Sequence, residues 1–255
     1  MKSKIKKLLS RLWYRPNSRH RILFGPMQGM WFKCSDNTGL AAVYSGNEKA
    51  NQRIYAQVVR AGDTVIDAGA NWGVHTLYLA KLVGGSGHVH AFEPHPIVVD
   101  ELRWHVSQNS MNQVTIHPCA LFDREDSLHF ELGANSKTSH LVNSSERSDN
   151  HQVMVPAKPL DSIVEAIELS SLRLMKIDVE GAEAALLQGA TKTIANHRPH
   201  LIVELHSPEQ DLLVAQKLSD WGYVIQRVDG PEILHLDRPW PDPNGVWGTL
   251  HAIPT

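Results

Sequence analysis

The sequence predicts an α/β fold in which helices cover both faces of a mostly parallel sheet. From residue 48 onward, short apolar runs with strand periodicity alternate with longer stretches of helical periodicity, and most of the connections between them are short. The chain shows no internal repeat at the period of a solenoid. Its 255 residues are enough for one such domain with a sizeable core and a short extension.

The predicted elements follow one another in a regular order. A helix at 48–59 leads through the turn Ala61-Gly-Asp63 to the first strand, and Gly84-Gly-Ser-Gly87 separates the next helix from the second strand. Short apolar or alternating runs predict strands at 64–67, 88–92, 114–117, 172–177, 201–204, 223–228 and 247–253, with a further edge strand at 127–130. Helical spacing predicts helices at 73–82, 97–109, 160–169, 183–196 and 209–220. Two polar or proline-rich stretches, 133–151 and 230–245, are expected to be long loops.

The first 21 residues differ from the rest of the chain in charge. They contain eight lysines and arginines and no acid, whereas the whole chain has a formal net charge of −2. Five apolar residues have the spacing of one face of an amphipathic helix: Ile5, Leu8, Leu9, Leu12 and Trp13. Residues 1–21 could therefore contact an anionic membrane surface or an acidic partner, or instead form a solvated terminus that packs on the domain. Residues 22–47 are expected to form a short hairpin-rich segment before the main domain at 48–255.

The composition limits the class of protein. Hydrophobic residues make up 42% and charged residues 20%, which is ordinary for a soluble globular domain. No apolar run approaches the roughly 18–20 residues that a membrane span needs. Two cysteines give neither a disulfide framework nor a zinc spacing, so a cytoplasmic location is expected. Because the chain beyond the basic tail is acidic, no nucleic-acid partner is expected.

A glycine-containing turn follows the first predicted strand. Asp67 ends the strand, and Gly69, Asn71 and Gly73 complete the pattern D-x-G-x-N-x-G. An open α/β sheet binds nucleotides at such a turn, where small residues let the backbone approach the ligand. Glu93 ends the next strand, where an acid can reach ribose hydroxyls. These residues therefore predict a nucleotide-type cofactor site.

The carboxylate of Asp67 discriminates between cofactors. It would repel the pyrophosphate of a dinucleotide, whereas S-adenosylmethionine carries a sulfonium and an ammonium that a carboxylate attracts. The pattern also departs from the G-x-G-x-x-G that a dehydrogenase would show. S-adenosylmethionine is therefore the expected cofactor, and an NAD(P)-dependent oxidoreductase is the alternative. His75, in the first turn of the following helix, is included among the predicted cofactor-binding residues.

Several motifs together resemble the FkbM family of methyltransferases. They are Val65-Ile-Asp-Ala-Gly-Ala-Asn-Trp-Gly-Val-His-Thr76, Phe92-Glu-Pro94, Leu160-Asp161, Met175-Lys-Ile-Asp-Val-Glu-Gly-Ala-Glu183, Gln188-Gly-Ala190 and Val203-Glu204. The resemblance covers roughly residues 48–206 and implies a class I methyltransferase (Rossmann-like) fold, with a seven-stranded sheet whose last strand is antiparallel. It also implies methyl transfer from S-adenosylmethionine, usually to a hydroxyl of a sugar or secondary metabolite. The cofactor-binding residues that it implies are Asp67, Gly69, Asn71, Gly73 and Glu93.

A group of acids is predicted at the acceptor side of the site. Asp178 and Glu180 follow a strand whose carboxyl end should border the transferred methyl group. Since an alcohol has to lose its proton during transfer, a carboxylate or imidazole within hydrogen-bond reach would assist. Asp178, Glu180 and His206 are the candidate catalytic residues. Glu183 is expected mainly to stabilise the N-terminus of its helix.

Metal binding and other activities remain as alternatives. Asp178, Glu180, Glu204 and His206 could hold a hard divalent cation, but carboxylates are common at such positions without a metal, so no metal site is predicted. The expected acceptor is a hydroxylated small molecule or a glycan, although the same residues could orient an amine. A non-catalytic scaffold is disfavoured because it has no need of these carboxylates. Three histidines near the second strand are interpreted as incidental: His88, His90 and His95.

Overall fold

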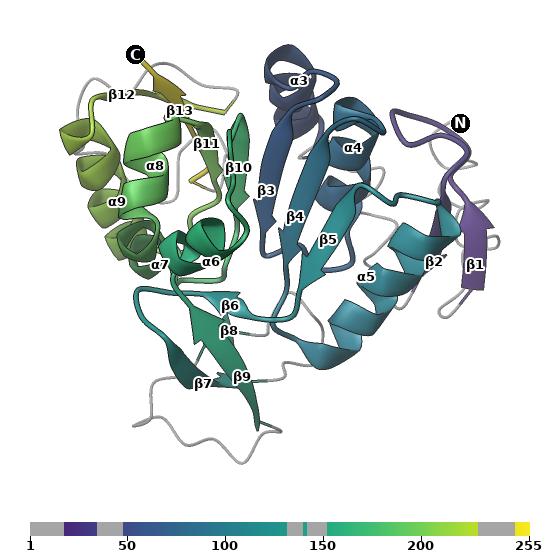
Figure 1. Cartoon of the computed structure of the whole chain (residues 1–255), viewed down its shortest axis with the longest axis horizontal. Coiled ribbons are helices and arrows are strands. Elements are labelled where there is room, and N and C mark those ends of the chain that lie inside the picture. Colours follow the sequence, from purple (N-terminus) through teal and green to yellow (C-terminus); the bar gives the residue numbers. More distant parts are fainter. Residues whose placement is uncertain (1–17, 35–47, 132–139, 142–151, 229–247) are drawn as a thin grey trace, which may run out of the picture.

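The computed structural model describes residues 18–34, 48–131, 140–141, 152–228 and 248–255. Its centre is a seven-stranded sheet with the strand order β12-β13-β11-β10-β3-β4-β5 (Figure 1). The strands are β3 (Thr64–Ala68), β4 (His88–Phe92), β5 (Val114–His117), β10 (Leu174–Ile177), β11 (His200–Val203), β12 (Tyr223–Arg227) and β13 (Leu250–Pro254). Neighbouring strands are parallel, except that β13 is antiparallel to both β11 and β12. The predicted sheet with an antiparallel last strand is confirmed, and that strand lies between β11 and β12.

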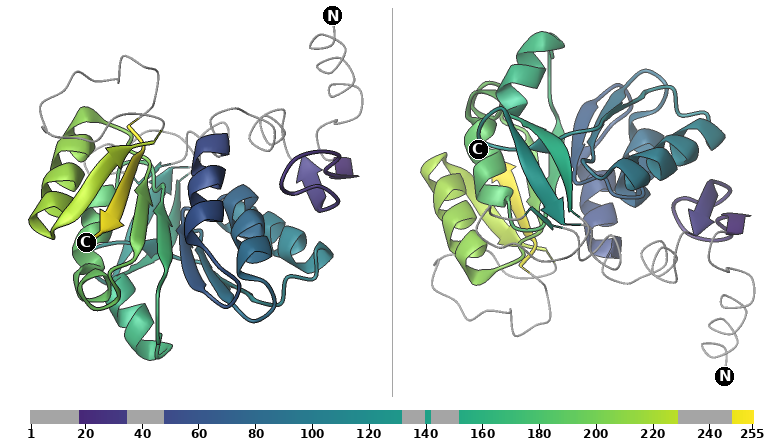
Figure 2. Two further views of the ribbon diagram at one scale, coloured as in Figure 1. Left: turned by 90° about the horizontal axis from the view of Figure 1, so that it is seen from above. Right: turned by 90° about the horizontal axis from the view of Figure 1, so that it is seen from below.

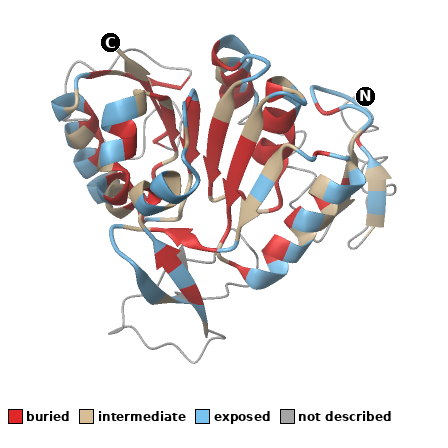
Figure 3. Cartoon of the chain, in the orientation of Figure 1, coloured by how far each residue is buried: buried red, intermediate tan, exposed pale blue. Residues whose placement is uncertain are grey.

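The helices lie on opposite faces of this sheet in two groups (Figure 2). One group is α3 (Glu48–Val58), α4 (Val74–Val83) and α5 (Pro96–Gln108); the other is α6 (Leu160–Ala166), α7 (Glu183–Gly189), α8 (Thr191–His197) and α9 (Pro208–Asp220). Successive residues of a strand pack against opposite faces of the sheet. Val65 packs in the same cluster as Leu77, and Ile66 packs in the same cluster as Leu186. The central strands are therefore buried on both sides (Figure 3), which explains their continuous apolar sequence.

The helix predicted at 183–196 is wrong in one respect, because the structure has two helices there, α7 and α8. Asp161, at the start of α6, provides the physical reason. Its carboxylate accepts hydrogen bonds from Lys192 N (3.0 Å), Thr193 N (2.8 Å) and Thr193 Oγ1 (2.7 Å). These N–H groups belong to the first turn of α8, so a side chain distant in sequence satisfies a second helix N-terminus.

The edge strand predicted at 127–130 belongs to a separate four-stranded sheet rather than to the main one. This sheet has the order β6-β9-β7-β8, with β6 (Ala120–Leu121), β7 (Asp126–Glu131), β8 (His140–Leu141) and β9 (Gln152–Lys158). Strand β9 was not predicted, although the buried Val155 and Ala157 alternate with exposed neighbours and its Pro156 is tolerated in the strand. Strand β8 falls within the predicted loop 133–151; the rest of that loop, and the loop predicted at 230–245, lie outside the described residues.

A hairpin precedes the main domain, and it starts earlier than the expected segment 22–47. Its strands are β1 (Ser18–Arg21) and β2 (Trp31–Cys34), which pair antiparallel. The hairpin is attached to α5, because Phe32 stacks on His105 at 4.3 Å between ring centroids and Asn109 forms hydrogen bonds with both backbone groups of Trp31. The first strand thus occupies the end of the predicted basic tail.

The amphipathic helix expected near the N-terminus lies outside the described residues, so membrane contact through residues 1–21 stays a prediction. Within the part of the chain that the structure describes, no helix has the length and apolar character needed to cross a bilayer.

The bridge from Asp161 to α8 can be tested by substitution. We expect Asp161→Ala to lower the free energy of unfolding by about 1 kcal/mol, because two N–H groups of the first turn lose their acceptor. Urea unfolding followed by circular dichroism measures this change. Asp100→Ala is the matched control, since the Asp100 side chain is 76% exposed and pairs with the exposed Arg103. Equal losses in the two variants would contradict the assignment.

Candidate active site

The turn between β3 and α4 has to accommodate two close approaches. Gly69 has a φ of +74°, and a Cβ at this position would lie 1.7 Å from the carbonyl oxygen of Asp178. Gly73 has a φ of +89°, and its Cβ would lie 2.4 Å from a methyl group of Leu102. Glycine is therefore required for backbone conformation and for packing at both positions. The first close contact brings the segment after β10 against this turn.

Glu93 ties this turn to the end of β4. One carboxylate oxygen accepts the N–H of Asn71 (2.9 Å) and the other accepts the N–H of His95 (2.8 Å). Burial raises the pKa of Glu93 to about 7, against the opposing effect of these two N–H donors. A carboxylate has about four acceptor sites, so two remain for further donors such as ribose hydroxyls.

Asp67 lies beneath the turn. Its side chain is fully buried, one oxygen accepts the hydroxyl of Thr76 at 2.6 Å, and the other lies 3.4 Å from the ammonium of Lys176. Lys176 is also buried, and its Nζ donates to the carbonyl of Gly69 at 2.8 Å and lies 3.2 Å from Asp178 Oδ2. Burial alone would lower the pKa of Lys176, but the attraction of Asp178 and Asp67 outweighs it and raises that pKa. The carboxylate of Asp67 is therefore paired with the ammonium of Lys176.

A cavity opens at the carboxyl ends of β3, β4 and β10. Its lining residues are Ala68, Gly69, Asn71, Phe92, Glu93, Pro94, Cys119, Ala120, Leu121, Asp178, Val179, Glu180 and Ala182. Five of the predicted site residues line it: Gly69, Asn71, Glu93, Asp178 and Glu180. The other four do not: Asp67, Gly73, His75 and His206.

His75 and Gly73 do not line the cavity but contact the helices that pack beside the turn. The imidazole of His75 is buried, and its Nδ1 shares a hydrogen bond of 3.2 Å with the hydroxyl of Tyr55 on α3. Gly73 packs against α5 as described above. Direct contact of Asp67, Gly73 or His75 with a cofactor stays a prediction; their observed contacts hold the turn in place.

On the other side of the cavity, three acids surround one histidine. His206 Nε2 lies 3.4 Å from Asp178 Oδ1 and 3.4 Å from Glu180 Oε2, while Nδ1 lies 2.7 Å from Glu183 Oε1. Asp178 and Glu180 come from the segment after β10, and His206 follows β11, the neighbouring strand. Parallel strands bring these residues together because their carboxyl ends meet at one edge of the sheet.

Burial and these contacts shift the pKa values of Glu180, His206 and Asp178 in different directions. Burial raises the pKa of Glu180 to about 7, although the positive charge of His206 acts against this. Burial alone would lower the pKa of His206, but the hydrogen bond to Glu183 and the attraction of Asp178 and Glu180 raise it to about 9. Burial also acts to raise the pKa of Asp178, but Lys176 and His206 outweigh it and hold that pKa below its usual range. At neutral pH, Glu180 can therefore exchange a proton on this side of the cavity, as Glu93 can at the turn after β3.

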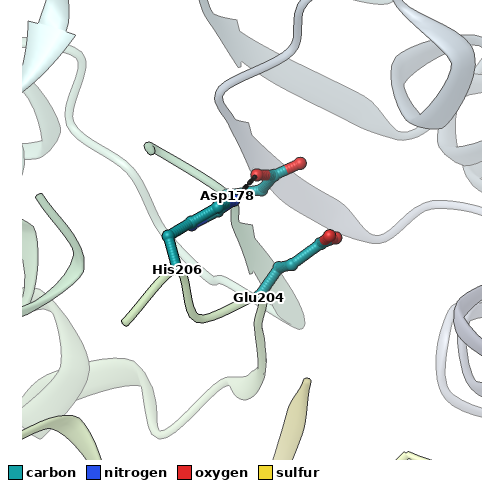
Figure 4. A group of neighbouring side chains, drawn as sticks. All are labelled: Asp178, Glu204 and His206. Carbon is teal, nitrogen blue, oxygen red and sulfur yellow. Dashed lines mark ion pairs between the residues drawn. The ribbon is translucent and has the colours of Figure 1, made fainter. Parts of the chain in front are cut away.

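Asp178 and His206 point toward one another beside Glu204 (Figure 4). One ligand atom from each lies within 4.8 Å of the others, a spacing within reach of a metal ion. Asp178 and His206, however, are paired with each other, and Lys176 neutralises Asp178 further. We therefore interpret Asp178 and His206 as an ion pair with Glu204 nearby.

Comparison with known proteins places this site in a family. A family model described as the methyltransferase FkbM domain matches residues 67–225. The chain belongs to the FkbM methyltransferase family. The matched region begins later and ends later than the resemblance to residues 48–206 indicated, and it includes the turn, Glu93 and the acids around His206.

Known methyltransferases are moderately similar to this chain. Methyltransferase 1 from Beauveria bassiana is 28% identical over 186 residues, covering 66% of this chain and 74% of that protein. Hexuronic acid methyltransferase AglP from Haloferax volcanii is 28% identical over 171 residues, covering 66% of each chain. A crystal structure of an FkbM methyltransferase from Methylobacillus flagellatus KT is 21% identical with a TM-score of 0.49, over 84% of this chain. The chain spans about half of that protein, 53% of its length.

Family membership confirms several expectations. The fold is that of class I methyltransferases, and the cofactor of this family is S-adenosylmethionine. The cavity fits this cofactor, because its turn is too tight for a Cβ, the Glu93 carboxylate has acceptor sites left for ribose hydroxyls, and its lining residues include no cluster of phosphate-binding cations. The alternatives of an NAD(P)-dependent oxidoreductase and of a scaffold without catalytic residues lose their support.

The structure adds Lys176 and Glu183 to the candidate site. Lys176 lies opposite Asp67 on the neighbouring parallel strand, and its signal in the sequence is a lysine within the otherwise apolar strand Leu174–Ile177. Glu183 was interpreted as a helix-terminal acid, whereas its buried carboxylate contacts His206. No sequence pattern links positions 183 and 206, because the contact crosses from α7 to the segment after β11.

The close approach at Gly69 predicts a loss of cofactor binding on substitution. In Gly69→Ala, the added methyl would meet the Asp178 carbonyl in a backbone conformation strained by at least about 1 kcal/mol. We expect S-adenosylmethionine affinity to fall by about tenfold or more, since 1.4 kcal/mol corresponds to a factor of ten. Isothermal titration calorimetry measures the affinity, and circular dichroism verifies the fold. Gly85→Ala is the control, because nothing lies within 4 Å of its added Cβ. Unchanged affinity in a folded Gly69→Ala protein would contradict the geometry.

Proposed function

We propose that this protein transfers the methyl group of S-adenosylmethionine to a hydroxyl of a sugar or another polyhydroxylated small molecule, and that Glu180 accepts the hydroxyl proton. The observation that carries the proposal is the position of Glu180, which lines the cofactor cavity and lies 3.4 Å from His206. Its pKa of about 7 suits a group that takes up a proton at neutral pH.

The residues around the turn hold the cofactor in this proposal. Gly69 and Asn71 offer backbone next to the cavity, and Glu93 offers its remaining acceptor sites. When bound, S-adenosylmethionine supplies a methyl group on a positively charged sulfur, which is a good leaving group. Positioning of the acceptor therefore contributes much of the catalysis, with the attacking oxygen about 3 Å from the methyl carbon.

Asp178 and His206 orient the acceptor. Asp178 stays ionised because Lys176 and His206 lower its pKa, so it accepts a hydrogen bond from a hydroxyl. His206 is protonated at neutral pH because its pKa is raised to about 9, so it donates a hydrogen bond and is the weaker candidate for the base. With Asp178 accepting and His206 donating a hydrogen bond, Glu180 is the residue of this group that takes up the proton.

A sugar-like acceptor is supported by two features. Carboxylates and an imidazolium at the edge of the cavity match the many donors and acceptors of a polyol. A relative that aligns with 66% of the chain is named a hexuronic acid methyltransferase, and a hexuronic acid is a sugar derivative.

Incubation with S-adenosylmethionine and a panel of neutral sugars, uronic acids and amino sugars, followed by NMR of the product, tests the acceptor class. A methyl ether supports the proposal, and methyl esters or N-methyl products alone would overturn it.

Replacement of the proposed base should reduce turnover without affecting cofactor binding. We expect Glu180→Gln to lower kcat by about 100-fold, because the amide keeps the shape of the side chain but cannot take up the proton. The affinity for S-adenosylmethionine should change little. Glu209→Gln is the control, since Glu209 is exposed in the first turn of α9. A Glu180→Gln protein with normal kcat would rule out this residue as the base.

The pH dependence of kcat follows from the same two groups. Glu180 must be ionised to accept a proton, so the rate should rise with pH through about 7. His206 must be protonated to donate, so the rate should fall as pH rises through about 9. The expected profile is bell-shaped, and its acid limb should disappear in Glu180→Gln. A rate that is independent of pH between 6 and 8 would contradict the assignment.

A further inference from the structure

Glu183 stands out as a buried carboxylate whose charge does not face solvent. It is the first residue of α7, its side chain is 0% exposed, and Oε1 accepts the N–H of Gly181 at 3.0 Å as well as His206 Nδ1 at 2.7 Å. Its other oxygen, Oε2, is buried and accepts no hydrogen bond from any described residue. An acid that only stabilised a helix N-terminus could remain at the surface and keep its hydration.

The burial of Glu183 implies that its charge is compensated by His206. A buried carboxylate is tolerated when a hydrogen-bonded partner of opposite charge lies beside it. The imidazolium of His206 is the nearest such partner, because its Nδ1–H donates to Glu183 Oε1. The short distance is typical of a charge-assisted hydrogen bond.

This hydrogen bond also fixes the direction of the second ring nitrogen. With Nδ1–H held by Glu183, Nε2–H is directed to Asp178 and Glu180, at 3.4 Å from an oxygen of each. A rotation of the ring would break the 2.7 Å bond and leave a buried carboxylate without its partner. The hydrogen bond to Glu183 thus sets the orientation of Nε2–H toward the acceptor side of the cavity.

We propose that Glu183 is a positioning residue for methyl transfer, and that it acts by holding His206 so that Nε2–H faces Asp178, Glu180 and the acceptor hydroxyl. Glu183 does not line the cofactor cavity, so it acts through His206. The proposal rests on the proposed function, in which His206 donates a hydrogen bond to the acceptor. It assigns to Glu183 the role that a carboxylate has when it orients a catalytic imidazole.

Several other charged groups face the same imidazole and have to be considered in the test. Asp178 and Glu180 approach from the segment after β10, and Glu204 from the end of β11. Lys176 lies behind Asp178. These groups remain in a Glu183 variant, so His206 should keep part of its raised proton affinity when Glu183 alone is changed.

The first measurement is independent of activity. NMR titration of protein labelled with ¹⁵N in its histidines, with the His206 signal assigned by comparison with His206→Gln, gives the pKa and tautomer of this ring. In Glu183→Gln, which keeps an acceptor oxygen near Nδ1 but removes the charge, we expect the pKa of His206 to fall by about 1 unit or more. An unchanged pKa and tautomer would overturn the pairing.

The second measurement reads turnover. We expect Glu183→Gln to lower kcat by about 10- to 100-fold, with little change in affinity for S-adenosylmethionine, and to move the alkaline limb of the pH profile to lower pH. Asp161→Ala is the matched control, because it removes another acid that serves a helix N-terminus but lies outside the site. That variant should lose stability without moving the pH profile. A Glu183→Gln protein that behaves like Asp161→Ala would show a structural role alone.

A double variant decides whether Glu183 acts through His206. If it does, Glu183→Gln combined with His206→Gln should have the same kcat as His206→Gln alone. Independent losses that multiply would overturn the proposal. Failure of the proposed function is distinguishable, because a wild-type protein that methylates no hydroxyl would leave the NMR titration unaffected.

Discussion

The buried ammonium of Lys176 connects the two halves of the site, and the remaining contacts depend on it. Lys176 lies on β10 directly opposite Asp67 on β3, and its Nζ reaches the carbonyl of Gly69 at 2.8 Å and Asp178 at 3.2 Å. A buried cation without partners would be strongly unfavourable, so Asp67 and Asp178 both have to stay close to Lys176. The cofactor turn and the acceptor carboxylate are thereby held at a fixed separation.

The charges of the site form a chain of shared partners. Lys176 lies between Asp67 and Asp178, and His206 lies among Asp178, Glu180 and Glu183. Burial acts to raise the pKa of both Asp178 and Glu180; at Asp178 the adjacent Lys176 and His206 outweigh burial and the pKa falls, whereas at Glu180 burial outweighs the attraction of His206 and the pKa rises to about 7. Carboxyl groups two positions apart in the sequence therefore acquire different roles from the balance between burial and the cations beside each one.

The sequence predicted those parts of the fold that local patterns determine. Strands such as β3 and β10 were located because they are short, largely apolar runs that are buried on both sides, and the glycine turn was located because φ above zero and close packing restrict Gly69 and Gly73. The contacts that cross the fold were not predictable in this way. The division into α7 and α8 depends on Asp161, and the role of Glu183 depends on His206, each more than 20 residues distant. Such pairings are set by the arrangement of strands in space, which local periodicity does not encode.

The raised pKa values of Glu180 and His206 set the pH range in which the proposed proton transfer can occur. Between about 7 and about 9, Glu180 is ionised and His206 is protonated, so the base and the donor are both present. A Glu180 with an ordinary pKa would be ionised over a wider range but would be a weaker base toward an alcohol. A His206 with an ordinary pKa would be neutral over most of the range in which Glu180 is ionised. The surrounding acids hold His206 charged while burial makes Glu180 more basic, and both effects follow from one compact cluster.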